Sequence, residues 1–176
     1  MRKLLLALLL AVDPGLSVAT PISVDQALSL PIAEVEAALP SSHPAVLYAH
    51  ARRLFETGRR DEAVVWFYAG QLRFRFHLRA NPSLPKDGEP ALMASLNATV
   101  GQTINEWAGG SPRQWASAID QALAWDQAHP NATTARDQHA AAWEATRRGL
   151  AGLRDQILTN QDQIREQRRS RGLENR

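Results

Sequence analysis

The chain has 176 residues, no cysteine, and a formal net charge of +2 from 20 basic and 18 acidic residues. Because disulfides are excluded, the fold must be stabilised by a packed core, and the length suffices for one such domain. The near balance of charge argues against nucleic acid or anionic membranes as partners.

Residues 1–19 have the three parts of a secretory signal peptide. Arg2 and Lys3 form a positive segment, nine apolar residues follow over 4–12, and small side chains stand at Ser17 and Ala19, where a signal peptidase reads. Nine apolar residues cannot span a bilayer, which needs about 20. We expect cleavage after Ala19, a periplasmic or secreted mature protein, and no transmembrane segment in it. A retained anchor is the alternative.

The first half of the mature chain is predicted to be helical. A short helix at 31–39 precedes helices at 45–56 and 61–78, which form a hairpin with its turn at Gly58. Residues 72–79 alternate strictly between apolar and polar side chains, as a half-buried strand would. We still predict a helix there, because the helical run has no break and a lone strand would have no partner.

This hairpin resembles one unit of the tetratricopeptide and Sel1-like repeats. The matching residues are Leu47, Ala51, Leu54, Gly58, Ala63, Phe67 and Gly70. The resemblance covers one repeat of about 34 residues and implies a protein-binding helical scaffold. His50 departs from the family, which usually has Leu there. A generic hairpin is the alternative, because any tight helix crossing needs small residues.

The second half completes an all-α bundle of five or six helices. Residues 80–90 hold three prolines and form a loop, and a helix over 92–107 ends at Gly109-Gly110. Ser111 and Pro112 are typical of a helix start, and that helix stops before Pro130.

The last predicted helix is unusually long. It starts near Thr133 and has a seam of residues at alternating spacings of three and four from Trp143 to Ile164, the pattern of a coiled coil, in which all members but Thr146 and Asn160 are apolar. Extended to Arg168 it would measure about 54 Å, so it must project or break. We expect a single domain over 20–165 and a polar, flexible tail over 166–176.

No catalytic or metal-binding motif is present. His43 and His50 share a helix face, but two ligands fall short of the three that a zinc site needs. Asp120 and Asp126 are six residues apart and face different sides of their helix. The sequence therefore favours a non-enzymatic protein without metal or cofactor.

The candidate binding residues lie on the 60–79 helix, which has no clean polar face. Trp66, Arg73 and His77 follow one stripe, and Tyr68 lies on another. A helix apolar on two sides is central to its fold, so Arg73 and His77 need partners. One interpretation pairs them with carboxylates of neighbouring helices. The other places them in a groove that binds an acidic or aromatic group. We expect Trp66 and Arg73 to be largely structural and His77 to lie at a groove edge.

The function predicted from these features is that of an exported protein-binding module. Its most specific form is an inhibitor or immunity protein that neutralises a toxin acting on the cell envelope. One alternative is an envelope hydrolase or small-ligand-binding protein that uses Arg73 and His77. The other is a structural assembly factor that self-associates through the C-terminal helix.

Overall fold

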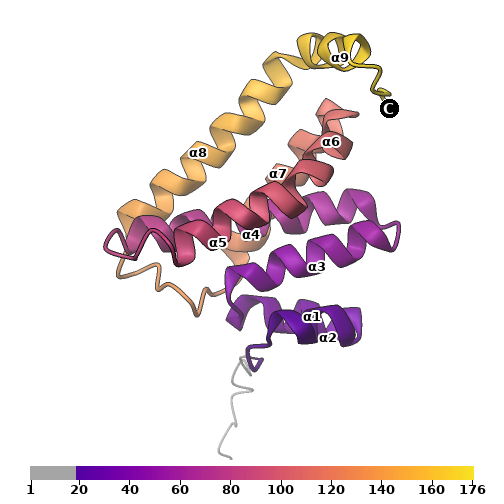
Figure 1. Ribbon diagram of the computed structural model, residues 1–176. Helices are drawn as coiled ribbons and strands as arrows, with labels where there is room; N and C mark the ends of the chain where they lie inside the picture. The colour runs from indigo at the N-terminus through magenta and orange to yellow at the C-terminus, as the bar shows by residue number, and fades with distance from the viewer. Residues whose placement is uncertain (1–18) are drawn as a thin grey trace, which may run out of the picture.

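The computed structural model describes residues 19–176, which are all-α and contain no strand (Figure 1). The prediction of an all-α helical bundle is confirmed, whereas the predicted signal peptide falls almost wholly outside these residues. The elements are α1 (Val24–Ser29), α2 (Ile32–Ala38), the 3₁₀ turn η1 (Leu39–Ser41), α3 (Pro44–Glu56), α4 (Arg60–Ala80), α5 (Glu89–Leu96), the π-helical turn η2 (Asn97–Gly101), α6 (Gln102–Gly109), α7 (Pro112–Ala128), α8 (Ala140–Thr159) and α9 (Gln161–Ser170). Within this range no helix is long and apolar enough to cross a membrane.

The two short N-terminal helices pack beside α3. Ser23 and Gln26 form a capping box at the start of α1, in which each side chain accepts a hydrogen bond from the other's backbone N–H. Arg53 of α3 donates to the carbonyl oxygens of Ala27 and Leu30, which end α1. These bonds satisfy backbone groups that a helix terminus leaves without partners, and they fix the lead-in segment against the hairpin.

The hairpin of α3 and α4 is the centre of the fold. Gly58 has a φ of +89°, a left-handed conformation that glycine adopts without strain, and it turns the chain between the two helices. The helix predicted across the alternating segment is confirmed, since α4 runs unbroken to Ala80 and buries Leu72, Phe74 and Phe76. Helix α4 contacts α3, α7 and α8, so it is buried on several sides. The sequence predicted this, because the 60–79 segment has no clean polar face.

Gly70 sets how closely α3 and α4 approach. A Cβ atom at this position would lie 3.0 Å from both Leu47 Cβ and Tyr48 Cδ2. We therefore expect Gly70→Ala to lower the free energy of unfolding by about 1–3 kcal/mol, the usual cost of overpacking. Gly149→Ala is the matched control in α8, because nothing lies within 4 Å of its Cβ position. There the helix propensity of alanine should stabilise by about 0.5–1 kcal/mol. Urea unfolding of both variants measures the difference, and equal effects would contradict this account.

The C-terminal half differs from the prediction at the start of its last long helix, and of the two outcomes expected for the far end of that helix it has the break. The last long helix starts at Ala140 rather than near Thr133, because Asn131 Oδ1 accepts hydrogen bonds from the backbone N–H groups of Thr133 and Thr134 and holds a turn. The helix also breaks, at Asn160, between α8 and α9. The break lets α9 fold back towards α6 instead of projecting (Figure 1).

Residues 166–176, which we expected to form a flexible tail, lie against α6 in the structure. Arg168 Nη1 donates to the carbonyl oxygen of Glu106 at 2.7 Å. The backbone N–H of Arg176 donates to the carbonyl oxygen of Gly110 at 2.6 Å. The tail therefore has defined contacts with the body of the protein.

Candidate functional site

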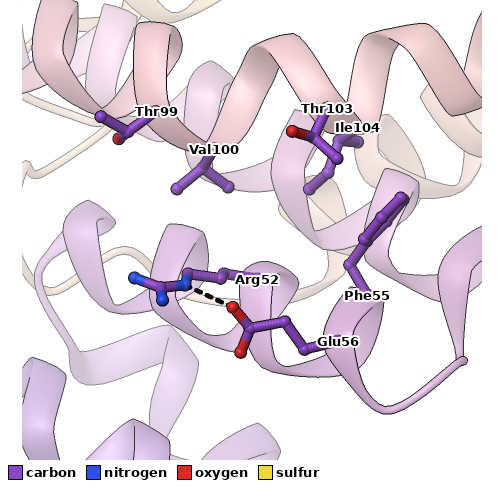
Figure 2. Close-up of a pocket in the computed structure, with 7 residues that line it drawn as sticks. All are labelled: Arg52, Phe55, Glu56, Thr99, Val100, Thr103 and Ile104. Carbon is purple, nitrogen blue, oxygen red and sulfur yellow. Dashed lines mark hydrogen bonds and ion pairs between the residues drawn. The ribbon is translucent and has the colours of Figure 1, made fainter.

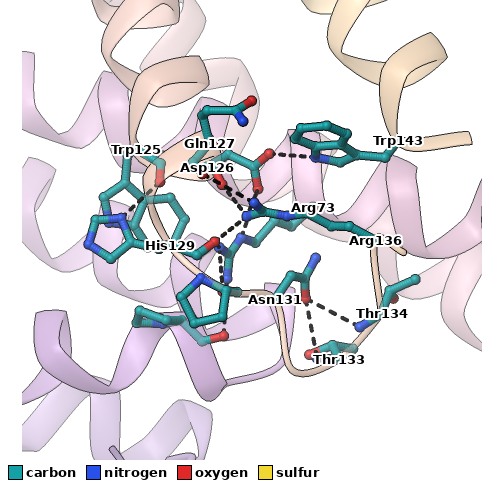
Figure 3. A network of polar contacts seen from close by, with 12 residues as sticks. Arg73, Trp125, Asp126, Gln127, His129, Asn131, Thr133, Thr134, Arg136 and Trp143 are labelled. Carbon is teal, nitrogen blue, oxygen red and sulfur yellow. Dashed lines mark hydrogen bonds and ion pairs between the residues drawn. The ribbon is translucent and has the colours of Figure 1, made fainter. Parts of the chain in front are cut away.

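Arg73 lies inside the protein, at the centre of a polar network between α4, α7 and the loop after α7 (Figure 3). Its side chain is 1% exposed, and Nε donates to Asp126 Oδ1 at 3.1 Å. The remaining donors reach the backbone carbonyl oxygens of Pro40, His129 and Pro130 at 2.9–3.2 Å. This guanidinium binds its own chain and has no face open to a ligand, as the structural interpretation expected.

Asp126 gathers further groups around the same ion pair. Its second oxygen, Oδ2, accepts from Trp143 Nε1 at 2.9 Å and from Arg147 Nη1 at 3.2 Å. Arg136 approaches Oδ1 at 3.6 Å and also donates to the backbone carbonyls of Asp126 and His129. The network thus joins α4, α7, the loop at 129–139 and α8 through one buried carboxylate.

The electrostatic balance of this network also fits a structural role. Burial lowers the pKa of Arg73 to about 10, while Asp126 opposes that effect, so Arg73 stays charged at neutral pH. Its guanidinium carbon lies 4.2 Å from the centre of the Trp125 ring. The buried charge of Arg73 thus has a counter-ion, an aromatic face and four hydrogen bonds, and removing one charged partner leaves the other charge buried without compensation.

Two other predicted binding residues also make internal contacts. Trp66 is partly buried and packs edge-on against His50 and Trp125, with ring centres 5.3 and 5.2 Å apart. Tyr68 is 2% exposed; its hydroxyl donates to Asn105 Oδ1 and accepts from Trp115 Nε1, both at 2.8 Å. Burial raises the pKa of Tyr68, which keeps this hydroxyl a donor. Tyr68 therefore positions α6 against α7.

His77, like Trp66, is only partly buried. Its Nδ1 lies 2.9 Å from Thr134 Oγ1, and its ring stands edge-on to His43 at 6.2 Å. His43 in turn meets Glu89 at 3.1 Å. Burial lowers the pKa of His77, with Glu89 acting in the opposite direction. Over residues 19–176 no group of three or more His, Asp and Glu side chains is arranged to hold a metal ion.

A surface groove lies elsewhere, between α3 and the η2–α6 segment (Figure 2). Figure 2 shows Val100 and Ile104 pointing towards α3, which contributes Phe55 and the ion pair of Arg52 with Glu56. The depression has a volume of about 110 Å³. Its floor is apolar and its rim is charged, which is the distribution found at protein–protein interfaces.

The π-helical turn shapes this groove. Asn97 Oδ1, at the first residue of η2, accepts hydrogen bonds from the Tyr48 hydroxyl at 3.0 Å and from Gln71 Nε2 at 3.2 Å. These two residues belong to the central hairpin, so the turn is anchored to the core. Single π turns within helices are frequent at functional sites. Here the turn leaves Thr99 exposed on the rim while Val100 is buried in the floor.

The groove continues towards the tail as a second depression of about 290 Å³. The two depressions share Phe55 and Thr103, and the second ends at Trp107, where Arg176 of the tail lies. We call this continuous surface the α3–α6 groove. The sequence analysis did not predict this groove. The one feature of the sequence that could have indicated it is Trp107, a large aromatic residue near the end of a predicted helix.

The structure thus defines an all-α protein with a groove between α3 of its central hairpin and the η2–α6 segment. No family model and no solved structure matches the chain. One similar protein is an "Uncharacterized protein" of Haemophilus influenzae, 34% identical over 87 residues that cover 49% of this chain and 34% of the relative. The chain therefore spans about a third of the length of that relative.

Proposed function

We propose that this chain is an exported, non-enzymatic module that binds a protein segment in the α3–α6 groove. The observation that carries the proposal is that the two depressions adjoin at Phe55 and Thr103, which places the partly exposed rings of Phe55 and Trp107 beside charged rims. A groove of this kind suits a helix or an extended segment of a partner, with apolar anchors in the floor and polar contacts at the rim.

Several features support this proposal over a catalytic function. The groove lining contains no histidine, and the Glu56 carboxylate is paired with Arg52 at 2.7 Å. The alternative of a ligand groove at Arg73 is disfavoured, because Arg73 is enclosed and bound to Asp126. The resemblance of the α3–α4 hairpin to a tetratricopeptide unit, kept here as a proposal, agrees with a scaffold for protein binding.

The signal peptide that the sequence predicts over residues 1–19 supports a partner in the cell envelope or outside the cell. An inhibitor or immunity protein directed at an envelope-acting toxin is the most specific form of the proposal. Self-association through the C-terminal seam is less favoured, since Leu150 and Ile157 of that seam are buried and Leu153 and Ile164 pack against the core of the same chain. Part of the seam is therefore used within the chain.

Thr103 offers the sharpest test, because it is exposed and borders both depressions. A photo-crosslinking residue at position 103 of the exported protein would first identify the partner in the envelope of the source cell. We then expect Thr103→Arg to raise the Kd for that partner at least about tenfold, which is about 1.4 kcal/mol, because the substitution introduces a long charged side chain at the groove. Its melting temperature should stay unchanged, because the side chain points to solvent.

Gln121→Arg is the matched control, since Gln121 is an exposed helical residue outside the groove and the substitution adds the same charge. Its partner binding should equal that of the wild-type protein. Equal affinities for Thr103→Arg and Gln121→Arg would show that the α3–α6 groove is not the binding site.

A further inference from the structure

One end of the α3–α6 groove holds a guanidinium group of the chain's own tail. The Arg176 guanidinium carbon lies 3.4 Å from the centre of the Trp107 ring. Its Nη1 lies 3.5 Å from Asp61 Oδ1, and its Nη2 donates to the backbone carbonyl oxygen of Trp107 at 3.0 Å. An aromatic face, a carboxylate and a carbonyl oxygen thus surround one cation, and all three favour a planar guanidinium.

The parts of this site also hold one another in place. Trp107 Nε1 donates to Asp61 Oδ1 at 2.9 Å, which orients the indole against the start of α4. The Arg60 guanidinium carbon lies 4.8 Å from the centre of the same ring. Only 25% of the Arg176 side chain is exposed, against 61% for Asp61. The guanidinium is therefore seated in the groove, while the carboxylate that meets it stays open to solvent.

The glycine pair at the end of α6 provides the space that the tail needs. A Cβ atom at Gly110 would lie 3.0 Å from Arg176 Nε, and one at Gly109 would lie 3.2 Å from Arg168 Nη1. Side chains at these positions would push both arginines away. The glycines that stop the helix thus also open one wall of the site.

Exchange of the tail for a partner segment requires that the contacts of Arg176 be weak. Leu173 is only partly buried, and the ion pair and cation–π contact of Arg176 lie at the solvent-facing end of the groove, where such contacts are weak. A partner segment that carries an arginine would make the same contacts and add apolar ones at Phe55, which is partly exposed and lines both depressions.

We propose that Trp107 and Asp61 form a guanidinium-binding subsite of the α3–α6 groove, which Arg176 fills in the free protein and an arginine of a protein partner fills in the complex. This inference rests on the proposed function. It adds that the partner presents an arginine in a flexible or extended segment, and that the tail competes with it.

The first arm of the test uses the full chain without any partner. The Trp107 indole N–H signal in the NMR spectrum can be assigned by its loss in Trp107→Phe. Arg176→Ala should shift this signal, because the cation above the ring is removed. Arg171→Ala is the matched control from the same exposed segment and should leave it in place. An unchanged signal in Arg176→Ala would overturn the assignment of Arg176 to this site.

The second arm adds an acetylated peptide with the sequence of residues 173–176, and the same peptide with alanine in place of arginine. We expect the arginine peptide to shift the Trp107 signal of Arg176→Ala saturably, with an apparent Kd at least about fivefold below that for the wild-type protein, whose own tail competes. The alanine peptide should have no effect, and Asp61→Asn in the Arg176→Ala chain should abolish the response.

Equal responses to the two peptides, no response in Arg176→Ala, or equal Kd values for Arg176→Ala and wild type would each overturn the proposal. These outcomes are separate from those of the Thr103→Arg experiment. If the peptide binds as expected while Thr103→Arg leaves partner binding intact, the subsite stands and the proposed function fails. If Thr103→Arg weakens partner binding while the arginine peptide has no effect on the Trp107 signal, the partner binds in the groove without placing an arginine at Trp107.

Discussion

Asp126→Ala should lower the free energy of unfolding by about 3–5 kcal/mol, the usual cost of breaking a buried ion pair by removing one partner. The substitution leaves the enclosed Arg73 guanidinium without its counter-ion, and it removes the acceptor that Trp143 and Arg147 share. Urea unfolding monitored by circular dichroism measures the loss. Arg73→Ala should be destabilising for the same reason, since it leaves a buried carboxylate with weaker partners.

The matched control is Asp120→Ala on the same helix. The Asp120 side chain is 52% exposed, and its ion pair with Arg154 lies at the surface, so its removal should cost under about 1 kcal/mol. The double variant of Arg73→Ala and Asp126→Ala should lose less than the sum of the single losses, because each single change leaves the other charge stranded. If Asp126→Ala were as mild as Asp120→Ala, the network would not be structural.

Acidification should destabilise the fold through His50. This side chain is 0% exposed, with Nε2 3.3 Å from Glu36 Oε1, and its Nδ1 has no hydrogen-bond partner among the described residues. Burial, followed by the nearby charges of Arg59 and Arg53, lowers the pKa of His50 from 6.5 to about 4, while Glu62 opposes the shift. The folded state therefore keeps His50 neutral at pH values where the unfolded chain protonates it.

The sign and range of the effect follow from this difference. Above about pH 7 His50 is neutral in both the folded and the unfolded state, so it does not change the free energy of unfolding with pH. As the pH falls from 6.5 towards 4, the unfolded state binds an extra proton, so the free energy of unfolding falls by about 3 kcal/mol in total. The lowered pKa of His77 adds a contribution of the same sign.

The comparison of wild type with His50→Leu isolates this contribution. The variant should show a flatter dependence of unfolding free energy on pH between 6.5 and 4, whatever its stability at neutral pH. His139→Leu is the control, since His139 is partly exposed outside the core and its removal leaves His50 in place. Parallel pH profiles for wild type and His50→Leu would show that His50 titrates with an ordinary pKa when folded.

The sequence determined the helical class and the central place of α4 because both depend on local patterns. Apolar residues at helical spacing indicated the helices, and the absence of a polar face on the 60–79 segment indicated burial on more than one side. The alternation over 72–79 did not override the helix, since Arg73, which a half-buried strand would expose, is buried and paired with Asp126 of α7. The need for a partner at Arg73 also followed from burial, because a buried charge must be paired.

Which groups meet was decided only by the tertiary structure. Arg73 and Asp126 are 53 residues apart, and nothing local distinguishes Asp126 from an exposed acid on the same helix. The α3–α6 groove arises where two segments cross, at a π turn held by hydrogen bonds from Tyr48 and Gln71 to Asn97. The tail over 166–176 is too polar for its position to be predicted from hydrophobic periodicity. It lies against α6 because Asp61 of α4 comes together there with Trp107 and the glycine pair at the end of α6. Local periodicity fixes the type of an element and its buried face, whereas contacts between distant faces depend on how all the helices pack at once.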